Sequence, residues 1–189
     1  MSVSPQNLFM SAPLTPAGQP RFRPLRLIDL PAIMAIETRV YAQPWTEGNF
    51  IDSLASGYAG FGLWLEGEAG KEPFLAAYFL AMKGVGEMHL LNISVRPENQ
   101  GQGLARLMLD ALVQLCRSEG CEQLWLEVRT GNTRAREVYR RYGLSEVGLR
   151  RAYYPVHQGQ REDAVLMSLP IDLMNQDQGQ NPGQEKAKQ

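Results

Sequence analysis

The amino-acid sequence predicts one α/β domain built from alternating strands and helices. Its 189 residues are the usual size of a single domain. Between residues 22 and 170, short apolar segments typical of strands alternate with segments of helical periodicity. The clearest helical segment has apolar side chains at i, i+3, i+4, i+7, i+8, i+11 and i+12, which are Leu104, Leu107, Met108, Ala111, Leu112, Leu115 and Cys116.

Two polar segments flank this domain. Residues 1–21 are rich in Pro, Ser, Ala and Gln and contain no acidic residue, which predicts a disordered leader. The leader lacks the charged start and continuous apolar stretch of a signal peptide. An organelle transit segment is the alternative, although no amphipathic helix is evident there. Residues 171–189 are also polar and are expected to form a disordered tail.

Composition and charge exclude several classes of protein. The net charge of −1 favours neither a nucleic acid nor an anionic membrane as a partner, and no apolar run approaches the ~20 residues of a membrane span. The only cysteines, Cys116 and Cys121, are not spaced as C-x-x-C. We therefore expect Cys116 to be a buried free thiol in a reduced, cytoplasmic protein. His89 and His157 are far apart and no Cys/His cluster exists, so no metal is expected.

The first half of the domain is expected to begin with a strand ending at residues 26–28, followed by two helices. Asp29 can cap the first helix, with Pro31 in its first turn. The segment Pro44-Trp45-Thr46 opens the second helix. Three strands follow, of which the first two form an antiparallel pair across a turn containing Gly and Pro. They are residues 61–66, 74–82 and 88–95.

The second half continues the alternation. Gly120 ends the long helix that starts at Leu104, and residues 124–128 have the composition of a strand. A helix ending at Gly143 follows, and two further strands close the sheet. The apolar residues of that helix are Ala135, Val138, Tyr139 and Tyr142, and the two strands are residues 146–149 and 164–169. The predicted order is β-α-α-β-β-β-α-β-α-β-β.

A glycine loop joins the strand that ends at Val95 to the helix that starts at Leu104. Such a loop exposes backbone N–H groups at a helix N-terminus, where they can bind a phosphate. It lacks the Lys-Ser/Thr pair of a P-loop, and Arg106 stands where a Rossmann loop has its third glycine. The remaining pattern is Gln100-x-x-Gly103-x-Ala105, and an ordinary strand–helix turn is the alternative to a cofactor loop.

This pattern resembles the pyrophosphate loop of the GNAT superfamily of acetyl-CoA-dependent N-acetyltransferases. The predicted order of elements also matches the GNAT fold, a mixed and strongly bent sheet with helices on both faces. The resemblance implies that the fourth and fifth strands splay apart and that acetyl-CoA enters the gap between them.

The second half is similar to the RimI-type enzymes, the bacterial ribosomal-protein-alanine N-acetyltransferases. The similarity extends from Pro24 to Pro170. It rests on Tyr41-x-x-Pro44-Trp45, on Leu124-Trp125-Leu126-Glu127-Val128-Arg129 followed by Asn132, Ala135 and Tyr139, and on Arg150–Pro155 and Arg161–Ala164. The resemblance implies a cytoplasmic enzyme, expected to be a monomer, whose substrate is the N-terminal alanine of a ribosomal protein.

Three positions depart from the RimI pattern. Relatives usually have Arg at the position of Gly101, which removes one possible phosphate contact. They usually have Phe at Leu144 and often Asn at Ala152, which belongs to the presumed substrate loop. Ala152 therefore bears on the choice of acceptor more than on the chemistry.

Glu127 is the candidate general base. It lies inside an apolar strand, where burial would make its carboxylate a stronger base than a solvated one. The alternative is a carboxylate paired with Arg129 or Arg150. The RimI resemblance implies that Glu127 accepts the proton of the attacking amine.

Tyr139 is the candidate general acid. A phenol of pKa about 10 can protonate, or hydrogen-bond to, a coenzyme A thiolate whose thiol has a pKa of about 8.5. The alternative is a core tyrosine, because Tyr139 shares an apolar stripe with Val138 and Tyr142. The resemblance favours the catalytic role for Tyr139, whereas Tyr142 is expected to be a core residue.

The remaining candidates bind cofactor or acceptor. Backbone groups of Ile93, Ser94 and Val95 are expected to pair with the pantetheine arm, with the Val95 N–H polarising the thioester carbonyl. The pyrophosphate would be bound by Gly101, Gln102, Gly103, Leu104, Ala105 and Arg106, and Asn132 is both a helix cap and a family cofactor contact. The acceptor groove would contain Tyr41, Trp45, Arg150, Tyr153 and Tyr154.

Several alternatives stay open. Arg150 and Arg151 can form a solvated basic patch, and Glu162 and Asp163 can either bind an amine or pair with these arginines. The enzyme can act on a small-molecule amine or on protein lysine. A non-catalytic module that binds acyl-CoA is the alternative from another class of protein.

Overall fold

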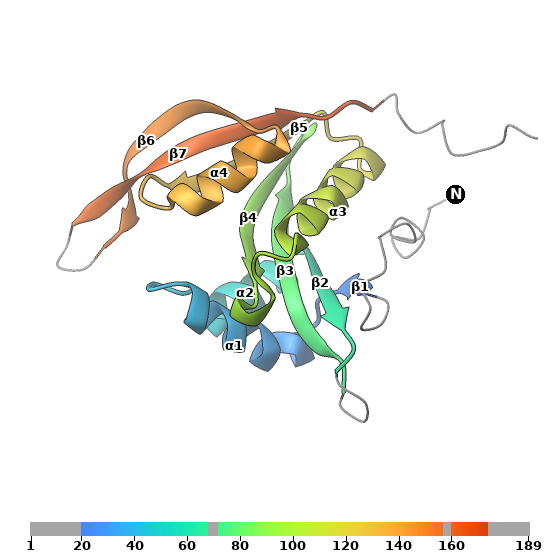
Figure 1. Ribbon diagram of the computed structural model, residues 1–189. Coiled ribbons are helices and arrows are strands. Elements are labelled where there is room, and N and C mark those ends of the chain that lie inside the picture. The colour runs from blue at the N-terminus through green and yellow to red at the C-terminus, as the bar shows by residue number, and fades with distance from the viewer. Residues whose placement is uncertain (1–19, 68–71, 157–159, 174–189) are drawn as a thin grey trace, which may run out of the picture.

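The structure is a computed structural model that describes residues 20–67, 72–156 and 160–173 (Figure 1). A seven-stranded mixed sheet has the order β1-β2-β3-β4-β5-β7-β6. Its strands are β1 (Arg21–Pro24), β2 (Ala59–Leu65), β3 (Phe74–Lys83), β4 (Glu87–Val95), β5 (Gln123–Arg129), β6 (Ser145–Pro155) and β7 (Arg161–Pro170). All neighbours are antiparallel except β4 and β5, which are parallel.

Four α-helices cover the two faces of the sheet. They are α1 (Leu30–Val40), α2 (Glu47–Ala55), α3 (Leu104–Ser118) and α4 (Thr133–Tyr142), with short 3-10 turns at η2 (Leu27–Asp29) and η3 (Pro97–Asn99). The predicted order of elements is confirmed. Residues of β3 alternate between two cores: Phe79 belongs to the core that α3 covers, and Tyr78 to the core that α1 and α2 cover. Figure 1 shows α1 and α2 together on one side and α3 and α4 on the other.

The predicted splay of β4 and β5 is visible in the strand register. Their pairing begins at Glu87 with Gln123 and ends at Leu90 with Leu126. Beyond that point β4 continues beside β3, whereas β5 continues beside β7 (Figure 1). The two strands therefore separate at Leu126, one residue before Glu127.

The first predicted strand boundary was wrong. The strand ends at Pro24, and residues 27–29 form a 3-10 turn in which the Ile28 side chain is 77% exposed. The turn forms because the Asp29 carboxylate accepts the Arg26 N–H at 2.9 Å and also binds the Arg23 guanidinium at 2.7 and 2.8 Å. These bonds hold residues 27–29 in a turn, although the apolar pair Leu27-Ile28 had suggested that the strand continues.

The last antiparallel pair is longer than predicted. β6 extends to Pro155 rather than ending at residue 149, and almost every residue in it is exposed. An exposed strand has no apolar alternation to reveal it. At the ends of the domain, Arg21 already belongs to β1, and Ile171 is buried with its N–H bonded to the Glu122 carbonyl at 2.8 Å. The rest of the predicted leader and tail, residues 1–19 and 174–189, lies outside the described residues.

Both cysteines are free and buried, as expected for Cys116. Burial raises the pKa of the Cys116 thiol to about 12, so it is protonated and unreactive at neutral pH. Among the described helices, none is long and apolar enough to cross a membrane.

Candidate active site

The gap between β4 and β5 has the geometry to accept an extended ligand. Because β5 no longer pairs with β4 after Leu90, the β5-side edge of β4 is not covered by a strand from residue 91 to Val95. A pantetheine arm pairs with such an edge through amide groups. Ile93, Ser94 and Val95 lie on this stretch, so their predicted role in binding the cofactor fits the strand register.

The loop after β4 forms an open cradle in front of α3. Gly101 and Gly103 have φ values of +78° and +82°, a conformation that disfavours side chains, and no atom lies within 4 Å of a Cβ built at either position. Gly103 is the N-cap of α3. This cradle of backbone groups at a helix N-terminus fits a pyrophosphate.

The other predicted loop residues differ in what they offer a ligand. The Leu104 side chain is buried in the core, so only its backbone can face the cradle. Ala105 follows it in the first turn of α3, and the Arg106 side chain is exposed. The Gln102 amide is bonded to the Glu98 carbonyl at 3.2 Å. Asn132 caps α4, since its side-chain oxygen accepts the Ala135 N–H at 3.1 Å. The structural role expected of Asn132 is thus observed, and its cofactor contact stays a prediction.

Glu127 is held by two groups of β6. The Arg150 guanidinium lies 2.9 Å from its Oε1, and the Tyr153 hydroxyl donates to its Oε2 at 2.8 Å. The Glu127 side chain is 24% exposed, so its environment is partly solvated and ionic rather than apolar as the strand pattern had suggested. Of the two arginines considered as its partner, Arg150 forms the pair. Charge-assisted bonds of this kind fix the orientation of a carboxylate.

A bulge in β6 brings Arg150 and Tyr153 to the same carboxylate. The register between β6 and β7 shifts between Arg150 and Tyr154, and Ala152 adopts a left-handed φ of +51°. The Asp163 carboxylate accepts the Ala152 N–H at 2.7 Å and Arg161 donates to the Ala152 carbonyl at 2.5 Å. Asp163 therefore stabilises the bulge, which answers the open question of its partner.

Arg129 closes the same side of the site. Its guanidinium pairs with Glu162 at 3.2 Å, donates to Gln43 at 3.1 Å and lies 4.4 Å from the centre of the Tyr154 ring. It thus links β5 to β7, to β6 and to the segment between α1 and α2. Glu162, for which binding an amine or pairing with Arg150 or Arg151 was considered, pairs with Arg129 instead.

Tyr139 is buried, with 9% of its surface exposed. Burial raises the pKa of the Tyr139 phenol well above its usual range, and the nearby hydroxyls of Tyr41 and Tyr154 raise it further. The hydroxyl is therefore protonated at neutral pH and can donate a hydrogen bond. Tyr142 is only partly buried, and its hydroxyl donates to Asp110 at 2.9 Å.

Tyr41 and Tyr154 each bond to one of the two splayed strands. The Tyr41 hydroxyl donates to the Ile93 carbonyl of β4 at 2.9 Å and accepts a bond from Ser94 at 3.1 Å. The Tyr154 hydroxyl donates to the Glu127 carbonyl of β5 at 3.0 Å. Tyr139 itself belongs to the buried cluster that contains Leu90 of β4 and Leu126 of β5, the last residues that pair before the strands separate.

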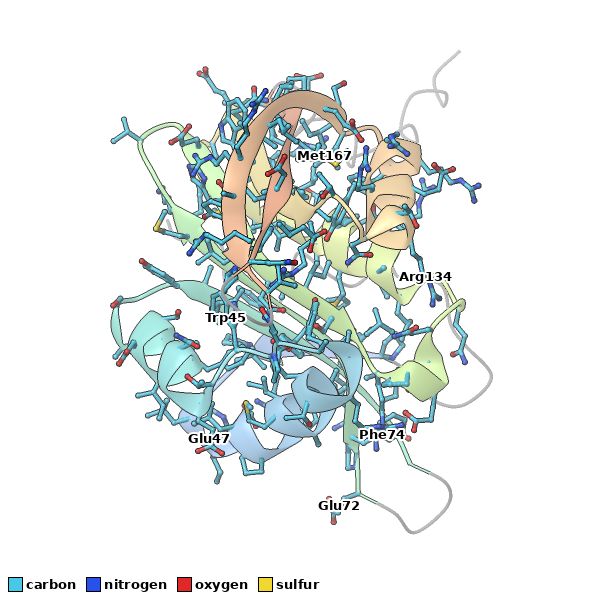
Figure 2. The ribbon with its side chains drawn as sticks, turned by 90° about the vertical axis from the view of Figure 1, so that its left-hand side faces the viewer. Trp45, Glu47, Glu72, Phe74, Arg134 and Met167 are labelled. Atoms are coloured by element: carbon cyan, nitrogen blue, oxygen red, sulfur yellow. The ribbon has the colours of Figure 1, made fainter. Side chains whose placement is uncertain are left out.

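A buried carboxylate that the sequence patterns did not single out anchors the backbone of Trp45. Glu37 is 1% exposed, and its carboxylate accepts bonds from the Trp45 N–H at 2.9 Å, from Asn92 at 3.2 Å and from the Tyr78 hydroxyl. A signal was available, because Glu37 lies one helical turn after the buried Ile33 and shares its face. The Trp45 ring packs on Phe50, 5.4 Å between centres, and Figure 2 shows it close to the start of α2.

A pocket of about 230 Å³ lies beside Glu127. Its lining is mainly apolar and aromatic, with Glu127 and Arg150 as its charged groups. The other lining residues are His89, Leu90, Leu91, Trp125, Leu126 and Leu166. Within the described parts of the chain, no group of three or more His, Cys, Asp or Glu side chains is placed to hold a metal ion.

Comparison with known proteins gives consistent matches. A model of the Acetyltransferase (GNAT) family matches residues 30–144. The [ribosomal protein bS18]-alanine N-acetyltransferase of Escherichia coli strain K12 is 39% identical over 149 residues, covering 79% of this chain and 96% of that protein. A putative enzyme of the same name from Bacillus subtilis is 30% identical over 150 residues, covering 79% and 95%. The crystal structure of the ribosomal-protein-S18-alanine N-acetyltransferase from Escherichia coli superposes with a TM-score of 0.70 at 37% identity, covering 84% and 98%.

Proposed function

The chain belongs to the GNAT family of acetyltransferases, and on this basis we propose that it transfers the acetyl group of acetyl-CoA to the N-terminal α-amine of a ribosomal protein. The acceptor residue is alanine, as the names of its relatives state for them. Acetyl-CoA supplies the thioester carbonyl that the amine attacks, and no metal takes part in the scheme.

One observation carries the proposal. Glu127 is the first residue of β5 after its pairing with β4 ends, and Tyr139 belongs to the buried cluster that contains Leu90 and Leu126, the last residues of that pairing. A proton acceptor and a proton donor therefore flank the gap into which a thioester would extend. The open glycine cradle in front of α3 supports this placement of the cofactor, because it would bind the phosphates while the thioester extends into the gap.

The reaction needs a neutral amine. An α-amine has a pKa of about 8 and a lysine of about 10.4, so neutralising the α-amine at pH 7 costs roughly 3 kcal/mol less. The Glu127 carboxylate takes a proton from the amine, directly or through one water, as nitrogen bonds to the thioester carbon. Arg150 and Tyr153 occupy one lone pair on each carboxylate oxygen, which leaves the others for this bond.

Collapse of the tetrahedral adduct breaks the carbon–sulfur bond. The Tyr139 hydroxyl donates a hydrogen bond to the departing thiolate, which stabilises its charge, and delivers a proton as the thiol forms. The proton that Glu127 took from the amine then returns to Tyr139 through solvent, which balances the reaction. The raised pKa of Tyr139 keeps this donor protonated at working pH. We assign the Val95 N–H to the carbonyl oxygen, and Tyr41, Trp45 and Tyr154 to the walls of the acceptor groove.

The test is coenzyme A release from acetyl-CoA with two hexapeptides. One has a free N-terminal alanine, and the other has a blocked N-terminus and one internal lysine. We expect turnover of the free N-terminus only, and a loss of about 10²-fold to 10⁴-fold in kcat for Glu127→Gln. Glu122→Gln, an exposed glutamate just before β5, is the matched control and keeps full activity.

The alternatives predict different outcomes of this test. Turnover of the lysine peptide alone would point to a lysine acetyltransferase. Tight binding of acetyl-CoA without turnover of either peptide would overturn the proposal in favour of a small-amine enzyme or a binding module. Unchanged activity in Glu127→Gln would leave the reaction standing and remove Glu127 as its base.

A further inference from the structure

Helix α4 carries four arginines, and one of them differs from the rest. Three have carboxylate partners within ion-pair distance. Arg134, by contrast, has no ion pair with any residue that the structure describes, and its guanidinium donates to the neutral side-chain oxygen of Gln100 at 3.0 Å. The three paired arginines are Arg136 with Glu146 at 3.0 Å, Arg140 with Glu146 at 2.8 Å and Arg141 with Glu137 at 2.7 Å.

The partner of Arg134 belongs to the glycine cradle. Gln100 directly precedes Gly101, and its amide nitrogen donates to the Val95 carbonyl at the end of β4, at 3.1 Å. The Arg134 side chain therefore reaches from the first turn of α4 to the loop before α3. Figure 2 shows Arg134 at the end of α4 that faces the region before α3.

The Gln100 amide is neutral, so it does not neutralise the positive charge of Arg134, and the guanidinium can still bind an anion. A guanidinium also presents several N–H donors in a plane, so one donor can bond to Gln100 while the others bind phosphate oxygens. At positions 101 and 103 the cradle offers only backbone groups, because both residues are glycines. Gly101 brings no charged side chain to this part of the loop, so a cation here can be supplied by Arg134 of α4.

We propose that Arg134 binds the pyrophosphate of acetyl-CoA across the glycine cradle, as a cofactor-binding residue that the loop motif does not contain. The proposal rests on the acetyl-CoA site of the proposed function. Gln100 positions the guanidinium before the cofactor arrives, which lowers the entropy lost on binding.

Calorimetric titration of the full-length protein with coenzyme A and with dephospho-coenzyme A tests the proposal. Dephospho-coenzyme A keeps the pyrophosphate and lacks the 3′-phosphate. We expect Arg134→Ala to weaken both ligands by about fivefold to tenfold at low salt, and by less at high salt because the contact is screened. Arg134→Lys keeps the charge, and its affinities are expected to lie between those of the wild type and of Arg134→Ala. Arg141→Ala, an exposed arginine farther along the same helix, is the control and binds both ligands like the wild type.

Each outcome bears on a different claim. Equal affinities of wild type and Arg134→Ala would overturn the proposal. A loss seen with coenzyme A but not with dephospho-coenzyme A would also overturn it, by assigning Arg134 to the 3′-phosphate. If the wild type bound neither ligand, the cofactor site of the proposed function would itself be wrong.

Discussion

The Arg150 guanidinium lies 2.9 Å from the Glu127 carboxylate, so its side chain reaches from β6 past the intervening β7 to β5. The side chain of Arg150 is 53% exposed and that of Glu127 is 24% exposed, so the pair contributes little to the stability of the fold. Its consequence is geometric. Together with the Tyr153 hydroxyl on the other oxygen, Arg150 fixes the plane of the carboxylate proposed to accept the amine proton.

Replacing Arg150 by glutamine is expected to lower kcat more than it raises the KM for the peptide. The carboxylate would lose its charged partner and rotate among several orientations, of which few suit proton transfer. We expect about a tenfold loss in kcat with the affinity for acetyl-CoA unchanged. Steady-state kinetics with a free N-terminal peptide measure both parameters.

Arg150→Lys and Arg151→Gln complete this experiment. Lysine keeps the charge without the planar fork and is expected to recover part of kcat. Arg151 is the exposed neighbour, and its replacement leaves kcat as it is. A rise in the peptide KM with no change in kcat would contradict the prediction and restore Arg150 to the acceptor groove.

Ala152→Asn is expected to stabilise the fold. Ala152 is the only non-glycine residue with positive φ among those described, and a left-handed conformation disfavours alanine more than asparagine. We expect the free energy of unfolding to rise by about 0.5 to 1 kcal/mol, as a higher midpoint in urea denaturation. Arg151→Asn, one residue earlier and without positive φ, serves as control, and an equal gain there would remove backbone strain as the cause.

Glu37→Gln is expected to weaken both the fold and the acceptor side of the site. The amide of glutamine would oppose one of the three donors that now bond to the buried carboxylate. We expect the free energy of unfolding to fall by about 1 to 3 kcal/mol. Because the acceptor of the Trp45 N–H loses its negative charge and this bond weakens, the KM for the peptide is expected to rise severalfold, with acetyl-CoA affinity retained.

Glu47→Gln is the control for Glu37, since Glu47 is exposed in the first turn of α2 (Figure 2). It is expected to change the free energy of unfolding by less than about 0.5 kcal/mol. If Glu37→Gln lowered stability and left both KM values alone, its carboxylate would serve the core and not the acceptor groove.

Alkaline pH is expected to unfold the protein from about pH 10 upward. Burial raises the pKa of Tyr41 to about 12, and the pKa values of the Tyr78, Tyr139 and Tyr154 phenols are raised as well. The folded state thus favours neutral phenols. Their contribution to stability is complete below the unfolded pKa of about 10 and is lost as pH rises through the folded values. Phenolate absorbance and circular dichroism, followed together, are expected to change in one transition, whereas early ionisation without unfolding would contradict the raised values.

Local periodicity was sufficient to predict most of the elements. The stripe from Leu104 to Cys116 predicted α3, and Gly120 and Gly143 marked the ends of α3 and α4, where both glycines have positive φ. Periodicity did not predict the full length of β6, because an exposed strand has no apolar alternation. It also placed the end of β1 too late, because a bond to the Asp29 carboxylate turns the chain there. Resemblance to a family supplied Glu127 and Tyr139 as candidates, which no spacing alone would have distinguished from an ion-paired carboxylate and a core tyrosine.

The sequence by itself determined the order of strands and helices, the glycine cradle and the family of the enzyme, because each depends on residues that are neighbours along the chain. The tertiary structure alone decided the partners of the charged groups. Arg150 rather than Arg129 binds Glu127, Arg134 reaches Gln100, and Glu37 bonds to Tyr78 and Asn92. These partners are separated by 23 to 55 positions in the sequence, and a polar side chain is satisfied by whichever group the packed helices and strands bring within hydrogen-bond reach.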